Sequence, residues 1–173
     1  MSKKKIIRIG FDLDGVIIDK PPFMPKTLIE WLVKSHKTKR LSYRYPESKY
    51  ERKLRYYSHH PIFRPPIAEN IKLIKLVAKK NVEIFIITSR YDFLETRTNE
   101  WFDFYKLNGL FSNRYLNLKN KQPYNFKIKT IKKLGLEIFV DDDKDLVEYM
   151  SSRVKKTKII SVNEIDKLSG LIK

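Results

Sequence analysis

The 173-residue sequence contains no cysteine, which excludes a disulfide framework, catalysis by a thiol and a metal site with thiolate ligands. It also lacks any run of about 18 apolar residues, so no segment is predicted to cross a membrane as a helix. The basic N-terminus leads straight into an apolar strand-like segment, unlike a secretory signal. We therefore expect a cytoplasmic protein without a membrane partner.

Acidic residues are scarce relative to basic ones, because 20 Asp and Glu face 37 Lys and Arg and leave a formal net charge of +17. A charge of this size indicates an anionic partner such as nucleic acid, a nucleotide or another phosphorylated ligand. A lysine-rich composition is an equally good explanation, since the basic residues are spread widely along the chain. Hydrophobic residues make up 42% of the sequence, which is typical of a globular protein.

Apolar runs typical of buried strands alternate with segments of helical periodicity. The predicted strands are residues 5–11, 82–88, 115–118, 136–140 and 158–162. The predicted helices are residues 25–37, 46–58, 67–77, 92–107, 126–134, 146–152 and 163–171. The strands are continuous apolar runs rather than alternating ones, which indicates a parallel sheet covered by helices on both faces. We predict a single α/β domain over residues 1–173 with a Rossmann-like, three-layer core.

Residues 34–64 differ in composition from the rest of the chain. They hold ten Lys or Arg against two acids, and half of the ten tyrosines. Because the segment has too few aliphatic residues for a core of its own, we predict a helical flap inserted after the first strand. Arginines interleaved with tyrosines suit an anionic, aromatic ligand such as a nucleotide, and a solvated charged surface is the alternative.

Three predicted strands end in polar clusters, namely Asp12-Leu13-Asp14, Thr88-Ser89-Arg90 and Asp141-Asp142-Asp143. The carboxyl ends of parallel strands meet along one edge of an open sheet, and ligands bind there. We therefore expect these three clusters to form one site.

The chemistry of this site follows from the kinds of side chain that it gathers. Two carboxylates at the end of a buried strand repel each other and lose solvation, and a divalent cation compensates for both effects. Oxygen ligands without nitrogen or sulfur favour Mg²⁺ over Zn²⁺. Magnesium together with a lysine suits the binding of a phosphoryl group, and a carboxylate can itself act as the nucleophile.

These motifs resemble those of the haloacid dehalogenase (HAD) superfamily, in the same order and over about two thirds of the chain. The first motif is Phe11-Asp12-Leu13-Asp14-Gly15-Val16, and the second is Ile86-Ile87-Thr88-Ser89. The third is a lysine ahead of the last motif, best matched by Lys127, and the fourth is Ile138-Phe139-Val140-Asp141-Asp142. The short matches are most similar to the branch that contains 5′-nucleotidases and polynucleotide phosphatases.

The resemblance implies a role for each motif residue. Asp12 is expected to be the nucleophile, and Asp14 the general acid for the leaving oxygen and then the base for the hydrolytic water. Thr88, with help from Ser89, is expected to bind the phosphoryl oxygens. Lys127 is expected to neutralise the nucleophile and the phosphate.

The resemblance also implies a Mg²⁺ ion held by the Asp12 side chain, the Asp14 backbone carbonyl and Asp142. Asp141 and Asp145 remain alternatives for the second metal-binding acid, and Asp145 is otherwise explained as an acid at a helix N-terminus.

Three further assignments stay open in the sequence. Lys129 lies two residues after Lys127 and is the alternative active-site lysine. Arg90 follows the second motif and is predicted either to bind phosphate or to pair with an acid of the fourth motif. His59 and His60 are interpreted as packing or surface residues.

Together these features predict a Mg²⁺-dependent phosphohydrolase that acts through an aspartyl-phosphate on a phosphorylated small molecule, a nucleotide or a nucleic-acid end. A phosphotransferase, or a non-catalytic nucleic-acid-binding protein on the same fold, is the alternative.

Overall fold

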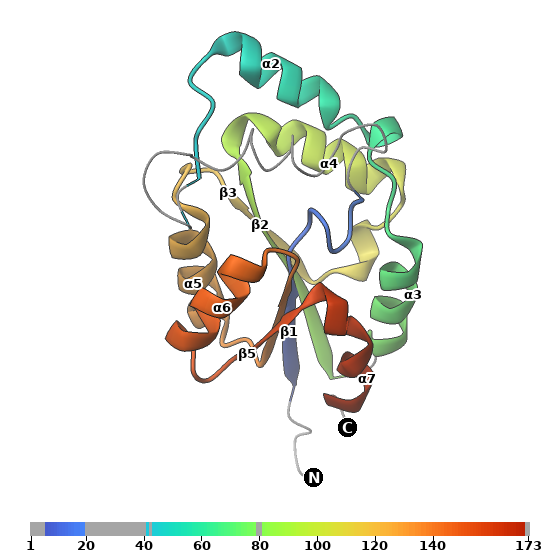
Figure 1. Ribbon diagram of the computed structural model, residues 1–173. Coiled ribbons are helices and arrows are strands. Elements are labelled where there is room, and N and C mark those ends of the chain that lie inside the picture. The colour runs from blue at the N-terminus through green and yellow to red at the C-terminus, as the bar shows by residue number, and fades with distance from the viewer. Residues whose placement is uncertain (1–5, 20–40, 42, 79–80, 172–173) are drawn as a thin grey trace.

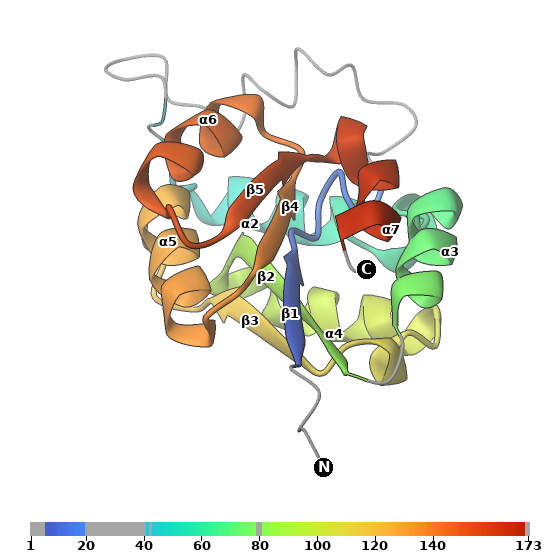
Figure 2. The same cartoon turned by 90° about the horizontal axis from the view of Figure 1, so that it is seen from below.

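The computed structural model describes residues 6–19, 41, 43–78 and 81–171, and they contain a five-stranded parallel sheet (Figures 1 and 2). Its strand order is β3-β2-β1-β4-β5. The strands are β1 (Ile7–Phe11), β2 (Val82–Tyr91), β3 (Asn113–Asn117), β4 (Ile138–Asp141) and β5 (Lys158–Ser161). From β1 the chain adds β2 and then β3 on one side, and it later returns to add β4 and β5 on the other side of β1. This reversal creates a switch point between β1 and β4, where such sheets bind ligands.

The helices cover both faces of the sheet, as Figure 2 shows. They are α2 (Lys49–Ser58), α3 (Ala68–Val77), α4 (Glu95–Phe104), α5 (Pro123–Leu134), α6 (Lys144–Arg153) and α7 (Leu168–Leu171). One apolar core joins α3, α4 and α7 to the sheet, and a second joins α5 and α6 to its other face. Successive strand residues alternate between the two cores, because side chains of a strand point to opposite faces. This confirms the predicted three-layer α/β fold.

Several predicted boundaries were wrong. The helix predicted from Pro46 begins at Lys49, because Ser48 is its N-cap and accepts a hydrogen bond from the backbone N–H of Tyr50. The predicted helix 163–171 is a 3₁₀ helix, η4 (Val162–Lys167), followed by the single turn of α7.

Two other boundaries moved by a few residues. The second strand continues past Thr88 to Tyr91, with an irregularity in its pairing to β3 between these two residues. The predicted helix 92–107 is divided into a 3₁₀ turn, η2 (Asp92–Leu94), and α4. The predicted helix 25–37 lies outside the described residues.

The described part of the predicted flap is fastened to α4. Figure 1 shows α2 above α4, at the end of the molecule towards which the strands point. Arg97 of α4 donates to the carbonyl of Tyr56 at 3.2 Å and lies 4.1 Å from the centre of its ring. Farther along, Tyr105 donates to the carbonyl of Pro61 in η1 (Pro61–Phe63) at 2.9 Å. These contacts fix the segment next to the strand ends.

None of the described helices is long and apolar enough to span a bilayer.

Candidate active site

The carboxyl ends of β1, β2 and β4 meet at one edge of the sheet, as the sequence predicted. Asp12 directly follows β1, and its backbone N–H donates to the carbonyl of Val140 in β4 at 2.8 Å. Asp141 is the last residue of β4. Thr88 lies near the end of β2 and is buried. The backbone therefore places the first, second and fourth motifs side by side.

A cluster of three carboxylates lies at this edge. Asp12, Asp141 and Asp142 each offer an oxygen, and these oxygens lie within 4.8 Å of one another. Asp141 is fully buried and Asp12 nearly so. The structure thus brings both candidate acids of the fourth motif to Asp12. Asp145 instead lies in the first turn of α6, outside this cluster.

Lys127 is the lysine that reaches the cluster. Its Nζ lies 2.7 Å from Asp141 Oδ2 and 3.1 Å from Asp12 Oδ1, and the side chain is buried. Lys129 is exposed on the same helix. Residues two apart on a helix point in different directions, so α5 can turn only one of these lysines towards the sheet edge.

Among the described residues, Asp12 and Asp141 share one ammonium group, that of Lys127, and Asp142 adds a third carboxylate beside them. Burial, assisted by the charges of Asp141 and Asp142, raises the pKa of Asp12 well above its ordinary value, although Lys127 acts in the opposite direction. Burial lowers the pKa of Lys127, but Asp12 and Asp141 outweigh this effect and raise it above its ordinary value. The lysine is therefore held in its charged form.

The residues present fit a hard divalent cation. Asp12 Oδ1 is buried without a hydrogen-bond donor among the described residues, although Lys127 lies near it. Three carboxylates and no nitrogen or sulfur ligand make up the donor set, which suits Mg²⁺. Burial raises the pKa of Asp12, with help from the neighbouring acids, and a divalent cation would offset both effects.

Gly15 is required where the chain turns beneath Asp142. Its φ is +76°, which only glycine adopts at little cost, and a Cβ there would lie 2.1 Å from Asp142 Oδ2. The glycine of the first motif therefore lets the fourth motif approach the first.

Gly15→Ala is expected to destabilise the protein by about 1–2 kcal/mol from backbone conformation alone, and by more through displacement of Asp142. Urea unfolding measures the loss, and a Mg²⁺ titration tests the displacement. Gly109→Ala is the matched control, because a Cβ there meets nothing within 4 Å. Equal effects of the two substitutions would contradict this account of Gly15.

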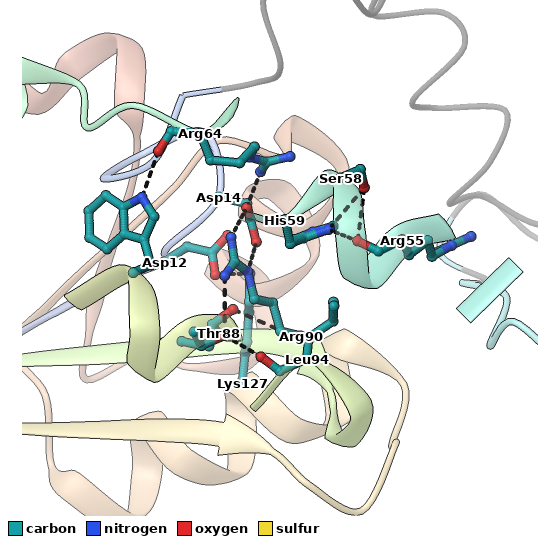
Figure 3. Close-up of polar contacts among 12 residues, drawn as sticks. Asp12, Asp14, Arg55, Ser58, His59, Arg64, Thr88, Arg90, Leu94 and Lys127 are labelled. Atoms are coloured by element: carbon teal, nitrogen blue, oxygen red, sulfur yellow. Dashed lines mark hydrogen bonds and ion pairs between the residues drawn. The ribbon is translucent and has the colours of Figure 1, made fainter. Parts of the chain in front are cut away.

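The side chain of Asp14 is not part of the carboxylate cluster but is held by two arginines, as Figure 3 shows. Arg90 donates through Nε to Oδ2 and through Nη2 to Oδ1, both at 2.7 Å. Arg64 donates to the same Oδ1. Burial raises the pKa of Asp14, but the charges of Arg90 and Arg64 outweigh it and hold that pKa well below its ordinary value. Asp14 is therefore ionised in this structure.

The three polar residues at the second motif, Thr88, Ser89 and Arg90, differ in their hydrogen bonds. Arg90 donates to an acid of the first motif, Asp14, through Nε and Nη2, and its third nitrogen, Nη1, donates to Thr98 at 3.1 Å. Thr88 accepts a weak hydrogen bond from the Arg90 backbone at 3.3 Å. Ser89 Oγ is buried and has no hydrogen-bond partner among the described residues. Thr88 and Ser89 thus keep hydroxyl groups available at the strand end.

Two residues next to Asp14 were not singled out for this site by the sequence. Arg64 was one of several flap arginines, and His59 was assigned to packing or the surface. His59 Nδ1 lies 2.7 Å from the carbonyl of Arg55, and Figure 3 shows its ring directed from α2 towards Asp14. Burial, with the charges of Arg90 and Arg64, lowers the pKa of His59 to about 3, so the ring is neutral. A signal for Arg64 was present in its apolar setting, Ile62-Phe63-Arg64-Pro65-Pro66, where a lone charge requires a partner.

No protein-family model matches the chain, and no curated protein sequence matches it significantly. A HAD-superfamily hydrolase from Ehrlichia chaffeensis is 13% identical, with a TM-score of 0.55 over 99% of this chain and 98% of its own. A HAD family enzyme from Bacteroides thetaiotaomicron, in complex with magnesium and inorganic phosphate, is 12% identical, with a TM-score of 0.51 over 90% and 93%. The chain has the haloacid dehalogenase-like fold.

The same fold relates the chain to part of a larger protein. A structure of the Pnkp1/Rnl/Hen1 complex matches at 10% identity, with a TM-score of 0.60 over 92% of this chain. This chain covers 47% of that one, so it spans about half its length. A second structure of this complex is described as an RNA repair complex.

Proposed function

We propose that the protein is a Mg²⁺-dependent phosphomonoesterase that acts through an aspartyl-phosphate. The observation that carries the proposal is the position of Asp12. It lies at the end of β1, where the ammonium group of Lys127 bridges it to Asp141 of the fourth motif and Asp142 lies close by. A carboxylate nucleophile needs a cation to hold it ionised in a buried site and further positive charge to accept an anionic substrate.

We propose a reaction in two steps. A carboxylate oxygen of Asp12 attacks phosphorus, the bond from phosphorus to the ester oxygen breaks, and the alcohol leaves with a proton from Asp14. Water then gives a proton back to Asp14 and attacks the phosphorus of the aspartyl-phosphate, which releases inorganic phosphate and restores the Asp12 carboxylate. In this proposal Thr88 and Ser89 donate hydrogen bonds to phosphoryl oxygens and Lys127 neutralises them. The unpartnered Ser89 Oγ among the described residues and the contact of Lys127 with Asp12 support these roles.

Mg²⁺ would be held by Asp12, Asp142 and the backbone carbonyl of Asp14, and when bound it supplies positive charge for the phosphoryl oxygens. Asp14 is ionised here, as a base for the hydrolytic water must be. To serve first as the general acid, Asp14 must take up a proton against the two guanidinium groups that bind it. The ionised state of Asp14 therefore suits its expected role as the base better than its expected role as the general acid.

We further infer that the substrate is a nucleotide or a nucleic-acid end, with residues 34–64 acting as a flap. The described part of the flap exposes large side chains, led by Tyr50 at 78% exposure, with Leu54, Tyr57 and Phe63. Exposed aromatic rings can stack on bases, and basic residues near them attract the backbone. The similarity to a protein of an RNA repair complex supports the same class.

A screen for release of inorganic phosphate tests the proposal. We expect Mg²⁺-dependent turnover that EDTA abolishes, with faster hydrolysis of nucleotides or of 3′- or 5′-phosphorylated oligonucleotides than of sugar phosphates. Transfer to an added acceptor in place of phosphate release would instead indicate a phosphotransferase. Binding of RNA with a steep salt dependence but no turnover of any phosphoester would overturn the enzymatic proposal.

A further inference from the structure

Arg64 is the point at which the flap enters the active site. It follows η1, and its backbone carbonyl accepts a hydrogen bond from Trp101 Nε1 at 2.6 Å. Trp101 is fully buried in the core, and only 7% of Arg64 is exposed. The main chain at Arg64 is therefore anchored, while the long side chain carries a positive charge to Asp14 (Figure 3).

Arg64 is not needed to satisfy Asp14. Arg90 alone engages both carboxylate oxygens in a two-pronged contact at 2.7 Å, the geometry that arginine and carboxylate prefer. Arg64 adds a second guanidinium to Oδ1, which Arg90 already occupies. Two guanidinium groups thus donate to the same carboxylate oxygen. The neighbouring His59 ring is neutral, and Asp19, which also acts on Arg64, has an exposed side chain.

Arg64 also has an unused donor. Its Nε is buried and has no hydrogen-bond partner among the described residues. A buried N–H group without an acceptor costs free energy, and the Nε and Nη2 hydrogens of arginine together match two oxygens of a phosphate group. The second guanidinium contact on Asp14 Oδ1 and the free Nε–H belong to the same side chain, and an anion bound to Arg64 would accept from this N–H group.

We propose that Arg64 binds a second phosphate group of the substrate, next to the phosphate that Asp12 attacks. This inference rests on the proposed phosphomonoesterase function. The first phosphate belongs at Asp12, Thr88 and Lys127, whereas Arg64 lies on the side of Asp14. When the second phosphate engages Arg64, Asp14 keeps its two-pronged contact with Arg90. A 3′,5′-bisphosphorylated nucleotide and an oligonucleotide with a terminal phosphate both provide this chemistry.

The test compares kcat/KM for adenosine 3′-phosphate, adenosine 5′-phosphate, adenosine 3′,5′-bisphosphate and a 3′-phosphorylated dinucleotide. The wild-type protein should prefer the substrates with two phosphates. Arg64→Ala should reduce kcat/KM for these by about 10- to 100-fold more than for the monophosphates, the range for one hydrogen-bonded charge. In the bisphosphate the second phosphate is a monoester, and in the dinucleotide it is the internal diester. Comparing the two substrates shows which of these sources Arg64 binds.

Arg97→Ala is the matched control, because Arg97 fastens α4 to the flap through Tyr56 without contacting Asp14. It should leave the preference for two phosphates unchanged, and Arg64→Lys should restore part of it. If Arg64→Ala and Arg97→Ala lose the preference for two phosphates equally, Arg64 acts only by holding the structure together, and the inference is contradicted. An unchanged preference in Arg64→Ala would overturn the inference while leaving the proposed function intact.

Calorimetric binding separates this inference from the proposed function. If no phosphoester is hydrolysed, the proposed function fails, and titration of adenosine 3′,5′-bisphosphate against adenosine 3′-phosphate still tests Arg64. Tighter binding of the bisphosphate that Arg64→Ala abolishes would support the second phosphate site. Equal affinities in the wild-type protein would contradict it.

Discussion

Asp12→Asn is expected to abolish Mg²⁺-dependent hydrolysis of p-nitrophenyl phosphate, with a loss in kcat of at least about 10³-fold, because an amide cannot form the aspartyl-phosphate. The same substitution should raise the thermal stability of the metal-free protein. The folded-state pKa of Asp12 is raised, so its ionisation opposes folding once the pH exceeds the ordinary pKa of aspartate. The amide has nothing to ionise and removes this cost.

The paired measurements are phosphate release in Mg²⁺ and thermal unfolding in EDTA at neutral pH. Asp145→Asn is the matched control, since Asp145 lies outside the carboxylate cluster. It should leave activity unchanged and stability within a few tenths of a kcal/mol, as for a charge in the first turn of a helix. Full activity of the Asp12→Asn variant would rule out Asp12 as the nucleophile, and a lower stability in EDTA would contradict the electrostatic account.

Lys127→Met is expected to inactivate the protein and to destabilise it in EDTA by about 3–5 kcal/mol, the cost of leaving buried charges without their partner. Methionine keeps much of the lysine's apolar volume, so the loss reports on charge rather than on a cavity. Asp12 and Asp141 would then face each other with no cation between them. Urea unfolding measures the change, and Mg²⁺ should recover part of it by compensating the same carboxylates.

Lys129→Met provides the comparison on the same helix. Lys129 is exposed, so its substitution should alter the free energy of unfolding by less than about 0.5 kcal/mol and leave turnover intact. If instead Lys129→Met removes activity and Lys127→Met does not, the third motif has been assigned to the wrong lysine.

The parallel sheet and the meeting of the strand-end motifs could be predicted because they depend on local patterns. A continuous apolar run such as 82–88 indicates a buried parallel strand, and the ends of parallel strands share one edge of the sheet. Once Asp12 and Asp141 end neighbouring strands, their proximity follows from the backbone. Helix boundaries were less predictable, because a single cap residue such as Ser48 can outweigh a proline two positions earlier.

The partners of Asp14 could not be predicted in the same way. Arg64 and Arg90 lie 50 and 76 residues from Asp14 in the chain, and no periodicity relates these positions. Arg64 reaches Asp14 because Trp101 and Tyr105 of the α4 region fasten η1 beside the strand ends. Arg90 reaches it because β2 continues past Thr88.

The sequence by itself determined the α/β fold and the carboxylate and hydroxyl groups that meet at one sheet edge. Strand periodicity and strand-end position fix these features through the backbone. The choice of Lys127 over Lys129, both on α5, came from the tertiary structure. Only the tertiary structure decided that Asp14 is an ionised partner of two arginines, and that one of them comes from the flap. The partners of a long side chain depend on how separate elements pack together. Here the hydrogen bond from Trp101 to the Arg64 carbonyl holds the main chain where the Arg64 side chain reaches Asp14.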